Sequence, residues 1–196
     1  MIIHLWDNAA MARTKTLPDL AVLDQAVALM HRGGPDQLTF ASLAAATGLS
    51  GATLVQRFGT KAGLRQRTLL HAWDALEQHT AQLIGSMERT PPGARRLLVE
   101  LSRDYGGIDA YAQGLLLLRE DLRDPLLRAR GAAWGQTLNA ALDACFAATP
   151  GAPAGVGRFM ASQWQGALLW WAFAPFTPVH EFVDEELARF VALFGA

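Results

Sequence analysis

Apolar residues recur at intervals of three and four positions along almost the whole chain, and no segment alternates as a strand does. The clearest apolar stripe follows Pro18 and ends before Gly33-Gly34-Pro35; it consists of Leu20, Leu23, Val27 and Met30. Such spacing places these side chains on one face of a helix. Hydrophobic residues make up 51% of the 196 residues, which is ample for a core. The sequence therefore predicts an all-α fold.

Two short helices, joined by a turn that contains glycine, are expected after the first helix. Thr39 is a good N-cap for one of them, and Gly48 ends it. Ser50 is a good N-cap for the other, which reaches Phe58. Two helices of about two turns each, with a three-residue turn between them, are typical of a helix-turn-helix unit.

A long helix is expected next, from Lys61 to Arg89, with Pro91-Pro92 as its end. At about 1.5 Å per residue it would span roughly 43 Å, enough to join a small head to a separate body. Glycine and proline delimit the remaining expected helices, which cover residues 94–105, 111–123, 125–148, 157–173 and 181–194.

Charge is balanced overall but unevenly placed along the chain. The sequence has 17 Lys and Arg against 18 Asp and Glu, yet residues 1–71 carry a net +3 and residues 72–196 a net −4. No acidic residue occurs between Asp36 and Asp74, whereas four basic residues fall in this gap: Arg57, Lys61, Arg65 and Arg67. We therefore expect a local cationic surface around the second short helix.

The second short helix has the composition of a DNA-reading helix. If Leu54 and Phe58 face the core, its outer positions carry small, hydroxyl, amide and guanidinium groups, which suit a major groove. Hydroxyl caps also mark three helix N-termini, which can bind phosphates: Thr39, Ser50 and Thr60. An ordinary helical hairpin with a solvated outer face is the alternative. The coincidence of caps and basic residues favours DNA binding.

The stretch from Leu38 to Leu64 resembles the N-terminal domain of TetR-type transcriptional regulators. The residues that match in order and spacing are Thr39, Leu43-Ala44, Gly48-Leu49-Ser50, Thr53-Leu54, Phe58, Lys61 and Leu64. The resemblance covers about residues 18–68. Two positions depart from the family pattern: Val55 replaces a Tyr that reaches the DNA backbone, and Pro35 replaces an aromatic residue of the head.

The resemblance implies a homodimeric, repressor-like regulator in the cytoplasm whose heads enter successive major grooves of a double-stranded operator. Its DNA-contacting residues would be Thr39, Ser50, Gly51, Thr53, Gln56, Arg57 and Lys61. Three parts follow: a flexible extension over residues 1–17, a helix-turn-helix DNA-binding domain over 18–68, and a helical body for effector binding and dimerisation over 69–196. A helical binding protein for a lipid or another hydrophobic compound, with this fold but without DNA reading, is the second hypothesis.

The C-terminal half is rich in aromatic and soft apolar residues. One interpretation is a pocket for a small hydrophobic or aromatic effector, with Trp134, Met160 and Trp164 among its walls; ordinary packing is the other. The segments Gly157–Phe173 and Glu181–Phe194 resemble the two helices that pair across the dimer axis in the family. From Phe159 onward the first has no charged residue, and its apolar run is too short to span a membrane, so we expect it to be buried.

The sequence offers no constellation for catalysis, a cofactor or a metal ion. His71 and His79 differ by eight residues on the long helix, about 80° apart in phase and two turns in height, which argues against a shared metal. The single cysteine, Cys145, excludes an intramolecular disulfide. We therefore expect neither an enzyme nor a membrane protein.

Overall fold

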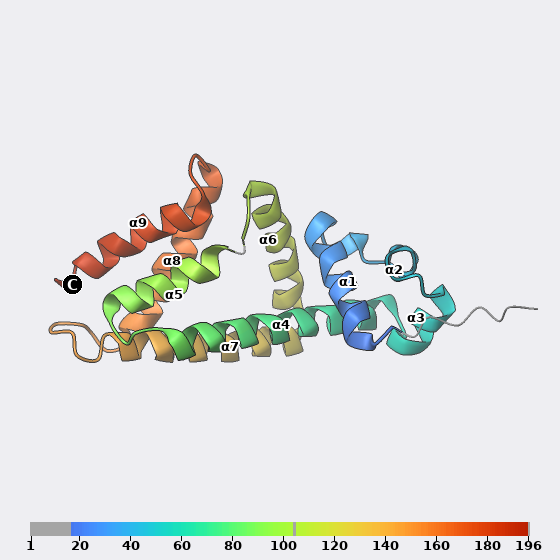
Figure 1. Cartoon of the computed structure of the whole chain (residues 1–196), viewed down its shortest axis with the longest axis horizontal. Helices are drawn as coiled ribbons and strands as arrows, with labels where there is room; N and C mark the ends of the chain where they lie inside the picture. Colours follow the sequence, from blue (N-terminus) through green and yellow to red (C-terminus); the bar gives the residue numbers. More distant parts are fainter. Residues whose placement is uncertain (1–16, 104, 196) are drawn as a thin grey trace, which may run out of the picture.

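The computed structural model describes residues 17–103 and 105–195, and this part of the chain contains helices but no strands (Figure 1). The helices are α1 (Asp19–Gly33), the short 3-10 helix η1 (Pro35–Gln37), α2 (Phe40–Thr47), α3 (Gly51–Phe58), α4 (Lys61–Ser86), α5 (Pro91–Arg103), α6 (Ile108–Arg123), α7 (Pro125–Cys145), α8 (Val156–Phe173) and α9 (Val179–Ala192). The all-α prediction is confirmed. The expected extension over residues 1–17 lies almost wholly outside the described residues.

Local side-chain caps explain where the helices of the head begin. The Thr39 hydroxyl accepts the Ser42 N–H at 3.0 Å, and the Ser42 hydroxyl in turn accepts the Thr39 N–H, which completes a capping box. Ser50 caps α3, and Thr60 caps α4. Gly48 ends α2 with φ of 72°, a left-handed conformation that favours glycine. The turn between α2 and α3 is therefore encoded locally.

The molecule is elongated, and α4 runs along it (Figure 1). Helices α1 to α3 form a head at one end, α8 and α9 lie at the other, and α6 stands upright between head and body. The 26 residues of α4 span about 39 Å. This helix ends at Ser86 rather than at Arg89 because Met87 adopts an extended backbone.

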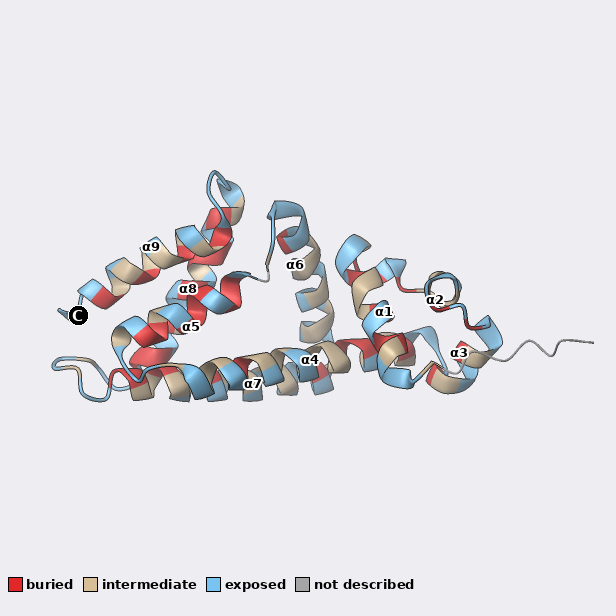
Figure 2. Cartoon of the chain, in the orientation of Figure 1, coloured by how far each residue is buried: buried red, intermediate tan, exposed pale blue. Residues whose placement is uncertain are grey.

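The buried residues of the described ranges form two separate apolar clusters (Figure 2). One holds α1, α2 and α3 against the start of α4, and it also includes Leu127 of α7. The other lies where α5, α7, α8 and α9 meet, around the fully buried Met160 and Leu168. Burial of apolar surface in each cluster stabilises the two ends of the molecule separately.

Prolines lie at the start of two helices that were expected to begin further along the sequence. Pro91 was expected to stop the long helix, yet it is the first residue of α5, and Pro178 directly precedes α9. The first turn of a helix has no backbone acceptor for its N–H groups, so proline costs little there. Helix α7 ends at Cys145, three residues before its expected end.

Helices α7 and α8 approach so closely at Gly157 that a side chain does not fit. A Cβ atom there would lie 2.3 Å from the Asn139 carbonyl oxygen and 2.6 Å from the Asp143 nitrogen. We expect Gly157→Ala to lower the free energy of unfolding by about 1–3 kcal/mol, because backbone atoms must move apart. Urea unfolding measures this loss. Gly114→Ala, on α6 with open space around the position, is the control, and an equal effect of both changes would contradict the packing.

Candidate nucleic-acid interface and ligand cavity

Helix α3 presents its predicted polar face to solvent. Leu54 and Phe58 are buried in the head, whereas Gln56 is exposed. Gly51 begins the helix and is also exposed, and the Thr53 hydroxyl lies 2.8 Å from that of Ser50. Helix α3 and its N-cap therefore present the Gln56 amide, the hydroxyls of Ser50 and Thr53, and the exposed backbone at Gly51. A helix that reads bases in a DNA groove requires accessible polar groups of this kind.

Arg57 points toward α1 and not along the outer face of α3. Its Nη1 donates to the Leu17 carbonyl at 2.6 Å and lies 3.4 Å from Asp19 Oδ1, and the side chain is only 23% exposed. Arg67 of α4 approaches the same carboxylate at 3.2 Å and also donates to the Arg57 carbonyl. Arg57 therefore fastens α3 to the start of α1.

The expected cationic surface is largely neutralised in space. Arg57 and Arg67 share Asp19, and Arg65 lies 2.8 Å from Glu120 of α6 and 3.7 Å from Asp36. The acidic partners come from outside the acid-free gap of the sequence, which is why the linear pattern did not reveal them. Of the four basic residues in that gap, only Lys61 makes no ion pair with another described residue, and it is exposed at the N-terminus of α4.

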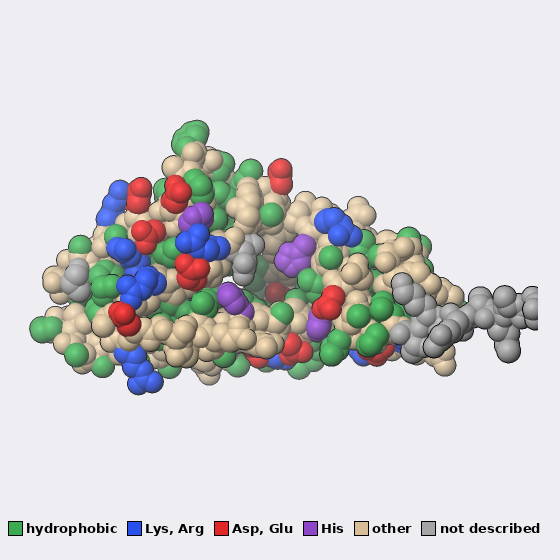
Figure 3. Space-filling view, viewed as in Figure 1, with side chains coloured by type: hydrophobic (Ala, Val, Ile, Leu, Met, Phe, Trp, Pro, Cys, Tyr) green, Lys and Arg blue, Asp and Glu red, His purple; other side chains and the backbone are tan. Residues whose placement is uncertain are grey.

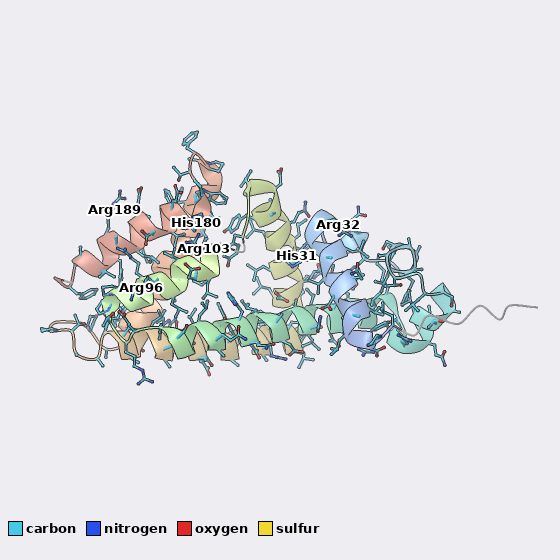
Figure 4. All side chains as sticks on the ribbon, viewed as in Figure 1. His31, Arg32, Arg96, Arg103, His180 and Arg189 are labelled. Atoms are coloured by element: carbon cyan, nitrogen blue, oxygen red, sulfur yellow. The ribbon has the colours of Figure 1, made fainter. Side chains whose placement is uncertain are left out.

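Basic side chains also gather away from the head. On the face shown in Figure 3, several lie over the body. Figure 4 places Arg96 and Arg103 on α5 and Arg189 on α9, while Arg32 projects from the C-terminal end of α1. Charge alone therefore does not single out the head. The head carries hydroxyl-capped N-termini at three consecutive helices, α2, α3 and α4.

The start of α4 is tied to α6 by polar contacts. The Arg65 guanidinium meets the Glu120 carboxylate, and Gln66 Nε2 donates to Asp124 Oδ2 at 2.7 Å. Helix α6 also packs against α1 of the head and against α7 of the body. It is therefore in contact with both ends of the molecule.

A cavity of about 610 Å³ lies between α4, α6, α7 and α8. Trp134 and Trp164, both predicted as ligand-binding residues, line it, whereas Met160 is fully buried in the body core and is absent from its wall. Trp73 of α4 and Asp121 of α6, which were not among the predicted ligand-binding residues, also line it. Gly135 of α7 faces the cavity with open space at its Cβ position.

The three indoles of the cavity are fixed by hydrogen bonds to the protein. Trp134 Nε1 donates to Thr80 Oγ1 at 3.0 Å, and Trp164 Nε1 donates to Ser102 Oγ at 2.8 Å. Trp73 Nε1 lies 3.3 Å from Asp121 Oδ1 and donates to it. Burial raises the pKa of the Asp121 carboxyl, and this hydrogen bond partly offsets the rise.

The outer face of α8 is apolar and exposed, so the expectation of a buried helix is wrong for this side. Trp170 is 70% exposed and Phe173 75% exposed, while Trp164 and Leu168 on the opposite side are buried. Phe176, after the helix, is 92% exposed. The Trp170 and Phe173 rings lie with centroids 5.8 Å apart, and exposed aromatic side chains grouped in this way are typical of interaction sites.

No group of three or more His, Cys, Asp or Glu side chains in the described ranges is arranged to hold a metal ion. None of the described helices is both long and apolar enough to cross a bilayer.

Arg57 and Lys61 should differ in their effect on the stability of the head. Arg57→Ala removes the contacts to Leu17 and Asp19, and we expect it to lower the free energy of unfolding by about 1–2 kcal/mol. Lys61→Ala removes an exposed side chain and should change it by less than about 0.5 kcal/mol. Chemical denaturation without DNA measures both. Equal effects would show that Arg57 does not fasten the head.

Comparisons with known proteins agree with this architecture. The sequence pattern of the bacterial regulatory proteins of the tetR family matches residues 22–68. Curated proteins give no match to the chain.

Solved structures match most of the chain. A transcriptional regulator from Saccharomonospora viridis, solved in complex with choline, is 17% identical with a TM-score of 0.70, over 87% of this chain and 93% of that one. A TetR-family member from Streptomyces coelicolor A3 is 20% identical, with a TM-score of 0.62 over 88% and 98% of the two chains. The multidrug binding protein EbrR, complexed with imidazole, is 20% identical, with a TM-score of 0.58 over 86% of each chain. These likenesses establish the fold, and the match over residues 22–68 shows that the helix-turn-helix part of the chain is of the tetR type.

Proposed function

We propose that the protein is a cytoplasmic, ligand-responsive regulator that binds a palindromic operator as a homodimer and is released from it by a small hydrophobic effector. The observation that carries this proposal is the α2–α3 helix-turn-helix, whose second helix exposes Gln56 beside capped helix N-termini, within the stretch that matches the family. Residues 18–68 would form the DNA-binding domain, and residues 69–196 the effector-binding and dimerisation body.

Phosphate contacts would come from the helix N-termini, with Thr39, Ser50 and Lys61 as side-chain partners. Base contacts would come from Gly51, Thr53 and Gln56 on the exposed face of α3. Arg57 was also expected to contact DNA, and a contact with a base would require its guanidinium to leave Leu17 and Asp19. In its observed position Arg57 would act by holding α3 at its angle to α1.

The effector would bind in the cavity between α4, α6, α7 and α8, against Trp134 and Trp164. A volume of about 610 Å³ suits a small organic molecule. Choline and imidazole, bound by the Saccharomonospora regulator and by EbrR, are also small organic molecules. Met160 does not line the cavity, and its role would be to pack in the core of the body that holds the two indoles in place.

The two copies would pair through α8 and α9, as expected for Gly157–Phe173 and Glu181–Phe194. The exposed aromatic residues Trp170 and Phe173 support this pairing, because a second copy would remove them from water. Dimerisation would set the distance between two heads, and engagement of one palindrome needs recognition helices about 34–36 Å apart. The effector would favour an arrangement of the two bodies that sets a different distance between the heads. Helix α4 would transmit this change from body to head.

Two substitutions should distinguish base reading from phosphate binding. The target is duplex DNA from the region upstream of the protein's own gene, and fluorescence anisotropy at several salt concentrations is the measurement. Gln56→Ala should weaken specific binding by about 1–3 kcal/mol and relax one base position. Lys61→Ala should weaken binding to all sequences and reduce the slope of log affinity against log salt by about 0.9 per lost phosphate contact.

Arg96→Ala, which removes an exposed charge from α5 of the body, is the control and should bind as the unmodified protein does. Unchanged affinity of the Gln56 and Lys61 variants would contradict the proposed interface. Absence of salt-dependent binding by the unmodified protein would favour the second hypothesis, a helical binding protein for a lipid or another hydrophobic compound.

The oligomeric state tests the role of α8. Trp170→Glu and Phe173→Glu each place a charge in the proposed interface, so we expect them to convert a dimer into a monomer in sedimentation velocity experiments. Leu126→Glu, at a similarly exposed apolar position on α7, should leave the dimer intact. A monomeric unmodified protein, or dimers in both interface variants, would refute the pairing.

A further inference from the structure

The walls of the cavity combine π faces with a carboxylate. The Trp73 and Trp134 rings lie with centroids 6.0 Å apart, and those of Trp134 and Trp164 lie 6.4 Å apart, so the three rings form a continuous aromatic wall. Each indole N–H already donates to a protein oxygen. The rings therefore have no N–H left for an anionic or carbonyl-bearing ligand, and what they can offer is their electron-rich faces.

The carboxylate of Asp121 is incompletely compensated. It accepts a hydrogen bond from the Trp73 N–H at 3.3 Å, and no basic side chain in the described ranges lies within ion-pair distance of it. The two neighbouring acidic residues of this segment have polar partners of their own. Glu120 pairs with Arg65, and Asp124 caps α7 and accepts a hydrogen bond from Gln66. A half-buried carboxylate without a counter-charge costs free energy, which a bound cation would recover.

The arginines of the cavity do not serve as that counter-charge. Arg128 and Arg158 line the wall but are exposed to solvent. The Arg128 Nη1 donates to the Leu122 carbonyl at 2.8 Å. Because these guanidinium groups remain hydrated, they have less to gain from a ligand than the half-buried carboxylate has.

We propose that the cavity selects an organic cation, a tertiary or quaternary ammonium on an apolar or aryl body, with the cationic nitrogen between Asp121 and the faces of Trp73 and Trp134. Cation–π attraction and ion pairing would act on the same nitrogen, while Trp164 and the apolar wall would hold the body of the ligand. This inference rests on the effector site of the proposed function and specifies its ligand class. It does not depend on whether the head reads DNA.

Isothermal titration calorimetry without DNA tests the inference. The probe is benzyltrimethylammonium, compared with uncharged 2-methyl-1-phenylpropan-2-ol of similar size and with anionic phenylacetate. We expect the cation to bind at least about tenfold more tightly than the neutral compound. Asp121→Asn should remove this preference and leave the binding of the neutral compound unchanged. Asp109→Asn, an exposed carboxylate on the same helix, is the matched control and should retain the preference.

Gly135→Leu places a side chain in the cavity and should abolish binding of both the cation and the neutral compound, whereas Gly85→Leu, at an exposed position of α4, should not. Thermal unfolding confirms that each variant is folded. Equal or tighter binding of the neutral or anionic compound, an unaffected Asp121→Asn variant, or no binding of the cation to the unmodified protein would overturn the inference. Operator binding measured without any ligand reports separately on the proposed regulatory function.

Discussion

The contact between Arg65 of α4 and Glu120 of α6 is the interaction on which the arrangement of head and body depends. It lies where the head meets the body, and Gln66 and Asp124 reinforce it one turn further along. The next residue of α6, Asp121, faces the cavity. Helix α6 thus contacts the head through Glu120 and lines the cavity through the adjacent Asp121. A ligand that displaces α6 cannot leave the start of α4 undisturbed, because the two helices share these polar contacts.

Ion pairs hold the helices of the head together and neutralise most of the basic side chains near α3. Asp19 compensates Arg57 and Arg67, and the Arg67 guanidinium also lies 4.7 Å from the centroid of the Phe58 ring. These contacts fix α3 relative to α1 and α4. Under the proposed function, affinity for DNA would then depend on backbone N–H groups at helix starts and on Lys61 more than on a broad cationic surface. A modest dependence of binding on salt follows from this arrangement.

The sequence predicted what is encoded locally and missed what is encoded by tertiary contact. Thr39, Ser50 and Thr60 were identified as caps because capping acts within three residues. The start of α5 at Pro91 was misread, since a proline after a helical pattern signals an end as readily as a beginning. The partners of Arg57 and Arg65 lie 38 and 55 residues away, so no linear window contains them. The role of Trp73 was missed for the same reason: nothing in the periodicity of α4 distinguishes a cavity wall from packing.

The central claim is that occupation of the cavity moves the two heads of a dimer relative to each other. Pulsed electron paramagnetic resonance measures this directly, with a spin label at Arg32→Cys, exposed at the end of α1, in a Cys145→Ser background. The account predicts that the distance distribution between the two labels shifts when benzyltrimethylammonium saturates the cavity, and that Gly135→Leu shows no shift. Identical distributions with the cavity empty and saturated would contradict it.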